Sequence, residues 1–304
     1  MKNRWWIYQQ ERFPIFMNTP LVVAFCLSVL LFSALQQEEA DLPSLIQVIG
    51  AVISTFILFF QLRVADEFKD FETDSRYRPH RAVPRGLVTL RELGVLAYVG
   101  AAIQFGIAIY LDFGLVPILA GVWIYMALMT KEFFAPDWLR GHPVIYLLSH
   151  MLIMPIIAFY ISAFDWLCIC NDYPGGLGWL LLLSFSCGLV LEIGRKIKTP
   201  AKEREGVETY SGLWGVPAAT VVWVICIAAS AAAYLKALSF VTAASDYWIV
   251  AVSLPLIGLL TAVPLLRRKW RRLKSADVAI EPVSGLVALT LYLCLGPIQF
   301  FMGW

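Results

Sequence analysis

Charged residues are scarce in this sequence. They make up 15% of its 304 residues, whereas 60% are hydrophobic and the mean hydropathy is +0.72. Soluble domains carry about 25% charged residues, so the composition excludes a soluble globular protein. Histidine is also scarce, at three residues, and the six cysteines have no His-rich neighbourhood, so we expect no zinc site. No small-residue cleavage pattern follows the basic start MKNRWWIYQQERFP, which argues against a cleaved signal peptide.

Long apolar runs fill most of the chain. A membrane-spanning helix needs about 20 apolar residues, and stretches of that kind recur evenly from end to end. We predict an all-α polytopic membrane protein forming one domain over residues 1–304. The nine predicted spans are 19–35, 44–62, 93–111, 114–130, 144–163, 177–194, 214–235, 247–266 and 283–302. Five prolines are expected to kink their spans, namely Pro117, Pro155, Pro217, Pro255 and Pro297.

The basic residues indicate the orientation, because Lys and Arg favour cytoplasmic loops. With the N-terminus in the cytoplasm, the inside segments are the N-terminal tail and the loops near 63–92, 131–143, 195–213 and 267–282. These hold 23 of the 24 Lys and Arg residues, and Lys236 alone falls outside. The C-terminus is then on the outer side. The segment RRKWRRLK at 267–274 either binds anionic lipid headgroups or merely sets the topology.

Four acids stand at the cytoplasmic end of the second predicted span. Asp66, Asp70 and Asp74 are spaced by four residues and would share one helix face, with Glu67 beside them. Unpaired acids at membrane depth cost about 2.5 kcal/mol or more each. A magnesium ion would relieve this cost, because it accepts carboxylates together with water and phosphate oxygens.

Arginines follow the acids closely. Phosphate oxygens can be held by Arg76, Arg78, Arg81 and Arg85, so acids, metal and arginines together describe a diphosphate site. The alternative is an ordinary loop beside the membrane, in which the acids and arginines simply pair with one another.

The segment resembles the first aspartate-rich motif of the UbiA superfamily of intramembrane prenyltransferases. That motif reads approximately N-D-x-x-D-x-x-x-D followed by R-P-x-P-x-G, and here it stands as D-E-F-K-D-F-E-T-D followed by R-A-V-P-R-G. Asp70 and Asp74 match directly, whereas Asp66 replaces the usual Asn and Glu67 the first Asp. The resemblance implies nine helices around a central cavity, with Asp66, Glu67, Asp70 and Asp74 as ligands of Mg²⁺.

A second, altered motif lies in the segment 191–215. In the family a second group of aspartates follows the sixth helix, and the resemblance places Glu192 and Glu203 at its first and last acids. The middle acid is replaced near Lys198 or Thr199. One reading keeps both acids as metal ligands; another has a single metal, with nearby cations neutralising the diphosphate. Those cations are Arg195, Lys196, Lys198 and Lys202.

The implied function is Mg²⁺-dependent transfer of an isoprenoid chain from a prenyl diphosphate to an aromatic or other lipid-soluble acceptor within the membrane. The resemblance implies Asp70, Asp74, Arg81 and Lys196 as catalytic residues. Lys131 and Arg140, after the fourth span, either contact the diphosphate or set the topology. Partners are the donor, a hydrophobic acceptor and membrane lipid, with no nucleic acid. Aromatic residues such as Phe60 and Tyr110 can line the isoprenoid tail or be plain core and lipid-facing residues.

Two other functions fit part of the pattern. A membrane terpene cyclase would ionise the same donor and use the donor's own double bond as the nucleophile, which the altered second motif favours. An ion-coupled transporter would use the carboxylates for ions. Transporters often contain inverted repeats, and the sequence has no detectable internal repeat.

Overall fold

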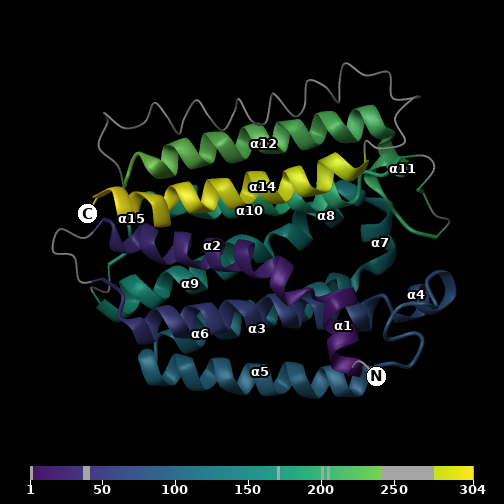
Figure 1. Cartoon of the computed structure of the whole chain (residues 1–304), viewed down its shortest axis with the longest axis horizontal. Coiled ribbons are helices and arrows are strands. Elements are labelled where there is room, and N and C mark those ends of the chain that lie inside the picture. The colour runs from purple at the N-terminus through teal and green to yellow at the C-terminus, as the bar shows by residue number, and fades with distance from the viewer. Residues whose placement is uncertain are drawn as a thin grey trace. The chain divides into compact units, whose positions relative to one another are not determined.

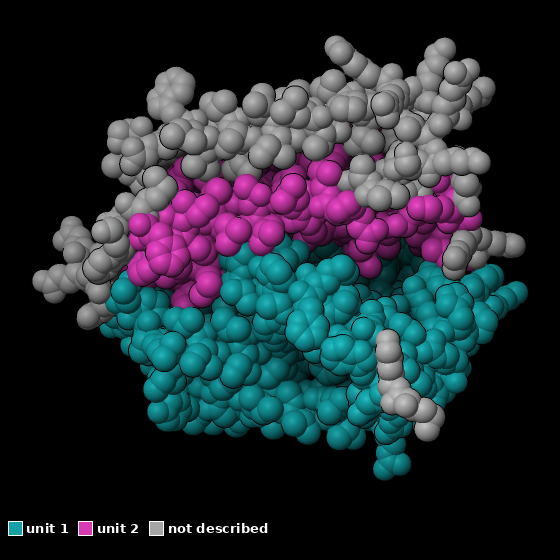
Figure 2. All heavy atoms as spheres, viewed as in Figure 1, with its two compact units in different colours: residues 1–26, 41–172 teal, residues 27–40, 173–304 magenta. Residues whose placement is uncertain are grey.

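All regular elements in the described part of the chain are helices. The computed structural model describes residues 3–36, 42–169, 172–199, 202–203, 206–241 and 277–303. These residues divide into two compact units, one over 1–26 and 41–172 and the other over 27–40 and 173–304 (Figure 2). The helix α2, Ile15–Ala34, begins in the first unit and ends in the second.

The first unit holds the predicted first motif. Its elements are α1 (Arg4–Arg12), α3 (Leu45–Lys69), α4 (Phe71–Tyr77), α5 (Leu90–Leu111), α6 (Leu115–Thr130), the 3₁₀ turn η1 (Glu132–Phe134), α7 (Pro136–Gly141), α8 (Pro143–Met151) and α9 (Ile153–Ile169). The long helix α3 packs against α5, α6 and α9. In Figure 1, α1 and α4 lie at the end of α3 where the motif begins.

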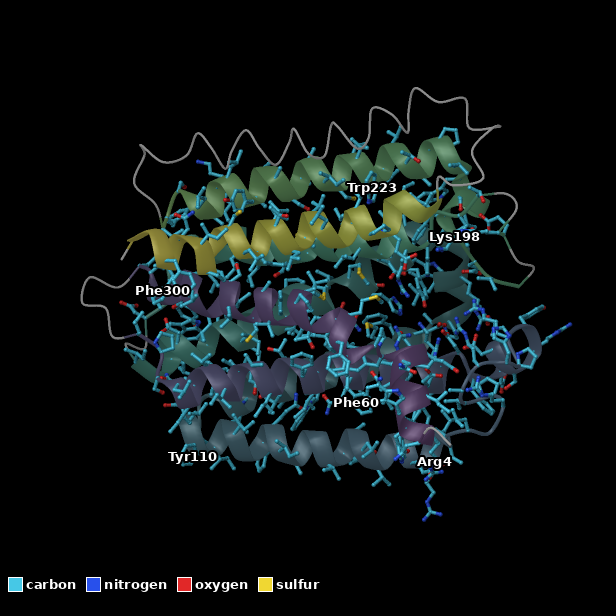
Figure 3. The ribbon with its side chains drawn as sticks, in the orientation of Figure 1. Arg4, Phe60, Tyr110, Lys198, Trp223 and Phe300 are labelled. Atoms are coloured by element: carbon cyan, nitrogen blue, oxygen red, sulfur yellow. The ribbon has the colours of Figure 1, made fainter. Side chains whose placement is uncertain are left out.

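The second unit is built on α10. Its helices are α10 (Leu177–Arg195), α11 (Tyr210–Trp214), α12 (Val216–Leu238), α14 (Asp277–Leu295) and α15 (Pro297–Gly303). Both α12 and α14 pack along α10 (Figure 1). Gly194 lets the end of α10 approach α12 and α14, because a side chain there would collide with Ser284. Trp223 donates to the Ser284 hydroxyl at 2.9 Å and is fully buried (Figure 3). This close packing fixes the end of α10, which carries Glu192.

Apolar helices long enough to cross a membrane confirm the all-α membrane fold. Seven such spans occur among the described residues, and a shorter apolar helix covers Leu115–Thr130. The spans are Ile15–Ala34, Leu45–Lys69, Leu90–Leu111, Pro143–Ile169, Leu177–Arg195, Val216–Leu238 and Ile280–Phe301. The predicted span 247–266 and the basic segment 267–274 lie outside the described residues. The count of nine helices and the single domain therefore stay predictions.

The prolines act less uniformly than the sequence suggests. Pro155 and Pro297 follow interruptions at Leu152 and Gly296, where α8 gives way to α9 and α14 to α15. Pro217 stands in the first turn of α12, where no backbone N–H is required, so the kink predicted there is wrong. Pro255 lies outside the described residues.

Glutamines inside the first unit join α3 to its neighbours. Gln47 donates to the Phe164 carbonyl on α9 at 2.9 Å, and Gln61 donates to the Ala97 carbonyl on α5 at 3.1 Å. From α5, Gln104 donates back to the Ser54 carbonyl at 3.1 Å. A polar group at membrane depth is costly without a partner, so these bonds hold α3 in a defined place and with it the motif at its end.

Candidate functional site

Asp70 lies at a bend between two helices. α3 ends at Lys69 and α4 begins at Phe71, and Asp70 between them has φ −90° and ψ 1°. The backbone hydrogen bonds nevertheless continue, from the Asp70 N–H to the Asp66 carbonyl at 2.9 Å and from the Asp74 N–H to the Asp70 carbonyl at 2.8 Å. Aspartate favours such helix ends, because its side chain competes with the helical backbone. The three aspartates thus follow one another turn by turn, with a bend at Asp70 between α3 and α4.

Two of the four predicted acids are buried among arginines. Glu67 is 2% exposed and pairs with Arg12 of α1. Asp74 is 3% exposed and pairs with Arg81, with Arg78 at 3.2 Å. Arg12 also lies 3.9 Å from Asp74, so one guanidinium spans both acids. Burial lowers the pKa of Arg81, an effect that its hydrogen bond to Asp74 opposes.

The other two acids are more accessible. Asp66 and Asp70 are both partly exposed, and Asp66 lies 3.4 Å from Arg63. Next to them, the ammonium of Lys69 donates to the Tyr146 hydroxyl at 2.5 Å and lies 3.9 Å from Glu132. This end of α3 therefore presents carboxylate oxygens beside cations of the chain itself.

The arginine-bearing loop is a short helical turn closed by a glycine. The Arg85 N–H donates to the Arg81 carbonyl at 3.0 Å, and the Leu87 N–H donates to the Ala82 carbonyl at 3.0 Å. Gly86 follows with φ 76°, a conformation that glycine adopts without strain. This explains why the segment R-A-V-P-R-G ends in glycine, and the turn sets the Arg81 and Arg85 backbones.

The N-terminal helix α1 fastens this loop to the first unit. Tyr8 is buried in an apolar cluster with Val64, Ala82, Val83, Val88 and Leu93. Glu11 receives a hydrogen bond from Arg85 at 2.8 Å, and Arg4 donates to Glu92 at 2.7 Å. Figure 3 shows Arg4 at the end of α5 remote from Tyr110. The sequence gives no local signal for these pairs, since Arg12 and Glu67 are 55 positions apart.

The remaining predicted cations of the first unit are exposed. Lys131 stands at the end of α6 and Arg140 in α7, where it lies 3.4 Å from Asp137. Of the predicted aromatic residues, Phe60 packs beside the apolar cluster around Tyr8, whereas Tyr110 is 72% exposed. The roles of these residues in binding the donor stay predictions.

The acids of the second motif already have partners within the second unit. Glu192 is buried and accepts from Arg195 at 2.5 Å and Lys196 at 3.0 Å. Glu203 accepts from the hydroxyls of Thr209 at 2.6 Å and Ser211 at 2.6 Å. The second motif is thus a set of neutralised or hydrogen-bonded carboxylates. Its outer cations are Lys198, which lies 3.3 Å from Glu281, and Lys202, which is exposed.

The oxygen ligands that each motif offers can be compared with the coordination that Mg²⁺ prefers. Among the described residues, no three His, Cys, Asp or Glu side chains form a ready metal site. Magnesium in phosphate-binding sites usually takes one or two carboxylates and completes its shell with water and phosphate oxygens. Asp66 and Asp70, consecutive along the helical ladder and partly exposed, fit that role. Glu192 and Glu203 do not fit it, because protein groups already engage their oxygens.

Comparison with solved structures identifies the fold. The apo structure of a UbiA homolog from Aeropyrum pernix K1 matches with a TM-score of 0.70 and 14% identity over 94% of this chain and 98% of that one. A structure of digeranylgeranylglyceryl phosphate synthase matches with a TM-score of 0.61 and 13% identity over 99% of each chain. No protein-family model and no curated protein matches the sequence. The chain thus has the same fold as these two proteins, as the resemblance of its first motif predicts.

Proposed function

We propose that this protein transfers an isoprenoid chain from a prenyl diphosphate to an aromatic or other lipid-soluble acceptor within the membrane. The observation that carries the proposal is the cluster of acids and arginines at the end of α3, on a fold shared with UbiA-superfamily prenyltransferases. Asp66 and Asp70 would offer oxygens for one Mg²⁺, and one helical turn further along the chain Asp74 pairs with Arg78 and Arg81.

The chain's own residues would bind and orient the diphosphate. Asp74 is buried and pairs with the guanidinium groups of Arg78 and Arg81, just after the C-terminal end of α3. Fixed cations stabilise the negative charge that develops on a leaving diphosphate. Magnesium, when bound, would further stabilise that negative charge. In the second unit, Lys196 pairs with Glu192 at the end of α10, and its part in catalysis stays a prediction.

A test compares Asp70→Asn with wild type on geranylgeranyl diphosphate in membranes of the native host, which supply lipid-soluble acceptors. The amide keeps the size of the side chain but ligates a metal poorly, so we expect release of inorganic diphosphate to fall by about 100-fold or more. Asp137→Asn is the matched control, because Asp137 is an exposed acid on α7 whose side chain is 95% accessible. Equal turnover in Asp70→Asn and wild type, with both proteins folded, would exclude the proposal.

A terpene cyclase is the second candidate function. The pairing of Glu192 and Glu203 with protein groups favours it, because the second motif then differs from the paired aspartates of the transferases. Incubation of purified protein with the donor alone separates the two. Release of a hydrocarbon or terpene alcohol without acceptor would identify a cyclase, whereas acceptor-dependent consumption of donor would identify a transferase.

A further inference from the structure

A carboxylate closes the segment that joins α10 to α11 in the second unit. Glu203 accepts from the Thr209 hydroxyl, which lies 2.8 and 2.6 Å from its two oxygens, and from the Ser211 hydroxyl at 2.6 Å. Glu203 is partly exposed, whereas Thr209 and Ser211 are buried. An ionised carboxylate can only accept hydrogen bonds, so the proton of each hydroxyl is directed at Glu203.

With their protons directed at Glu203, the two hydroxyl oxygens accept from backbone N–H groups. Ser211 accepts from the Lys198 N–H at 2.8 Å, and Thr209 accepts from the Gly212 N–H at 3.0 Å as the N-cap of α11. The first N–H groups of a helix have no partner within the helix, so such a cap stabilises the helix start. Glu203 thus fastens the chain just after α10 to the beginning of α11.

The same connection sets the surroundings of Lys196. The Tyr210 N–H donates to the Lys196 carbonyl at 3.1 Å, and the Lys196 ammonium lies 5.5 Å from the centroid of the Tyr210 ring, which attracts a cation. Tyr210 is buried and stacks on Trp214 with centroids 4.8 Å apart. The ammonium also pairs with Glu192 at 3.0 Å, and the side chain stays 30% exposed. Lys196 is therefore held between fixed partners and remains accessible to a ligand.

The two acids of the second motif face different groups. Glu192 pairs with Arg195 and Lys196, whereas Glu203 accepts from two hydroxyls of its own segment. A magnesium ion on Glu203 would compete with the hydroxyl protons for the same oxygens. No group of three His, Cys, Asp or Glu side chains that could hold an ion occurs in the described part of the chain. The geometry of Glu203 therefore suits a structural connection better than metal ligation.

We infer that Glu203 is a positioning residue and not a ligand of magnesium. It closes the connection between α10 and α11, and this connection holds the ammonium of Lys196 where it can bind a diphosphate. The inference rests on the proposed function, because the placement of Lys196 matters for turnover only if Lys196 binds the donor.

The test is calorimetric titration of the full-length protein in detergent with inorganic diphosphate at limiting and at saturating magnesium. Glu203→Gln keeps an oxygen that accepts a hydroxyl proton but ligates magnesium poorly, so its affinity should fall by less than about threefold, with the wild-type dependence on magnesium. Glu203→Ala should lose about tenfold, as should Thr209→Val combined with Ser211→Ala. All three changes together should lose no more, because they remove the same connection.

A second background separates positioning from a general loss of structure. Lys196→Met should itself weaken diphosphate binding by about tenfold. In that background Glu203→Ala should cause no further loss, because the ammonium that Glu203 positions is already absent. Glu208→Ala is the matched control, since Glu208 is an exposed glutamate of the same segment, and it should bind diphosphate as wild type does. Thermal unfolding in the same detergent checks that each variant is folded.

Two results would overturn the inference. One is a loss in Glu203→Gln as large as in Glu203→Ala with a higher magnesium requirement, which would make Glu203 a metal ligand. The other is an additive loss from Glu203→Ala and Lys196→Met, which would separate Glu203 from Lys196. If Glu203→Ala does not fold, the magnesium dependence of Glu203→Gln decides the matter alone. A wild-type protein that does not bind diphosphate with magnesium would instead contradict the proposed function itself, so the two failures are distinguishable.

Discussion

At the scale of single residues, burial decides what each acid of the first motif can do. Glu67 and Asp74 are almost fully buried, and breaking such pairs costs about 3–5 kcal/mol because an uncompensated charge remains. Their arginines are thus structural partners as well as candidate phosphate ligands. Asp66 and Asp70 keep partial exposure, so we expect these two acids, and not Glu67 and Asp74, to be available to a metal.

A substitution at Tyr8 tests whether burial has the effect on polar groups described above. Its hydroxyl is buried with no hydrogen-bond partner among the described atoms, and burial together with the charge of Glu67 raises its pKa. Removing an unsatisfied buried hydroxyl should be neutral or should stabilise the protein by up to about 1 kcal/mol. We therefore expect Tyr8→Phe to melt at the wild-type temperature or above in a thermal unfolding scan in detergent.

The control variant removes the whole aromatic ring of Tyr8. Tyr8→Ala should destabilise the protein by about 3 kcal/mol or more, because it empties the centre of an apolar cluster. If Tyr8→Phe instead lost more than about 1 kcal/mol, the hydroxyl would have a hydrogen-bond partner in solution, such as a buried water near Glu67.

The sequence identifies the acids of the site but not their partners. Asp66 to Asp74 stand out because their spacing is local and the cost of charge near a membrane is large. Arg12 and Tyr146 carry no such signal, since they reach Glu67 and Lys69 across 55 and 77 positions. The burial of Glu192 likewise depends on tertiary structure. The sequence therefore does not reveal that neighbouring groups neutralise or hydrogen-bond the acids of the second motif.

At the scale of elements, two helices begin with the same capping motif at opposite ends of the first unit. Ser44 and Gln47 form a capping box at the start of α3, and Thr89 and Glu92 form one at the start of α5. Both satisfy backbone N–H groups that the helix leaves unpaired. They differ in surroundings, because Glu92 also receives a hydrogen bond from Arg4 of α1.

Because only Glu92 also bonds to α1, replacing the capping residue by alanine should have different effects at the two helices. Ser44→Ala and Thr89→Ala should each lower stability by about 1 kcal/mol. Thr89→Ala should in addition weaken binding of inorganic diphosphate with magnesium, by about threefold, because it loosens Glu92 and thereby the α1 contacts that fasten the arginine loop. Calorimetric titration and thermal unfolding measure the two effects separately. Equal diphosphate affinity in both variants would mean that α1 does not position the site.

At the scale of the whole molecule, charge placement predicts that the loops after α6 and α10 are cytoplasmic and the end of α12 is outside. The described helices agree with seven membrane spans by length and hydropathy, and Leu115–Thr130 adds a shorter apolar helix. Apolar length is a strong sequence signal, but the count of nine spans stays a prediction, because the span 247–266 lies outside the described residues. Sidedness depends on where cations stand relative to the membrane, and it stays a prediction.

Cysteine labelling tests that orientation in each unit. In a variant whose native cysteines are replaced by alanine or serine, Asp137→Cys and Lys202→Cys report the predicted inside, and Phe113→Cys and Lys236→Cys the predicted outside. All four positions are exposed, so a membrane-impermeant maleimide can reach each thiol. We expect the first pair to react in inverted vesicles and the second pair in right-side-out vesicles, because 23 of the 24 basic residues fall on the predicted cytoplasmic side. Reaction of all four positions from one side would contradict the topology, and with it the cytoplasmic placement of Asp66 and Asp70.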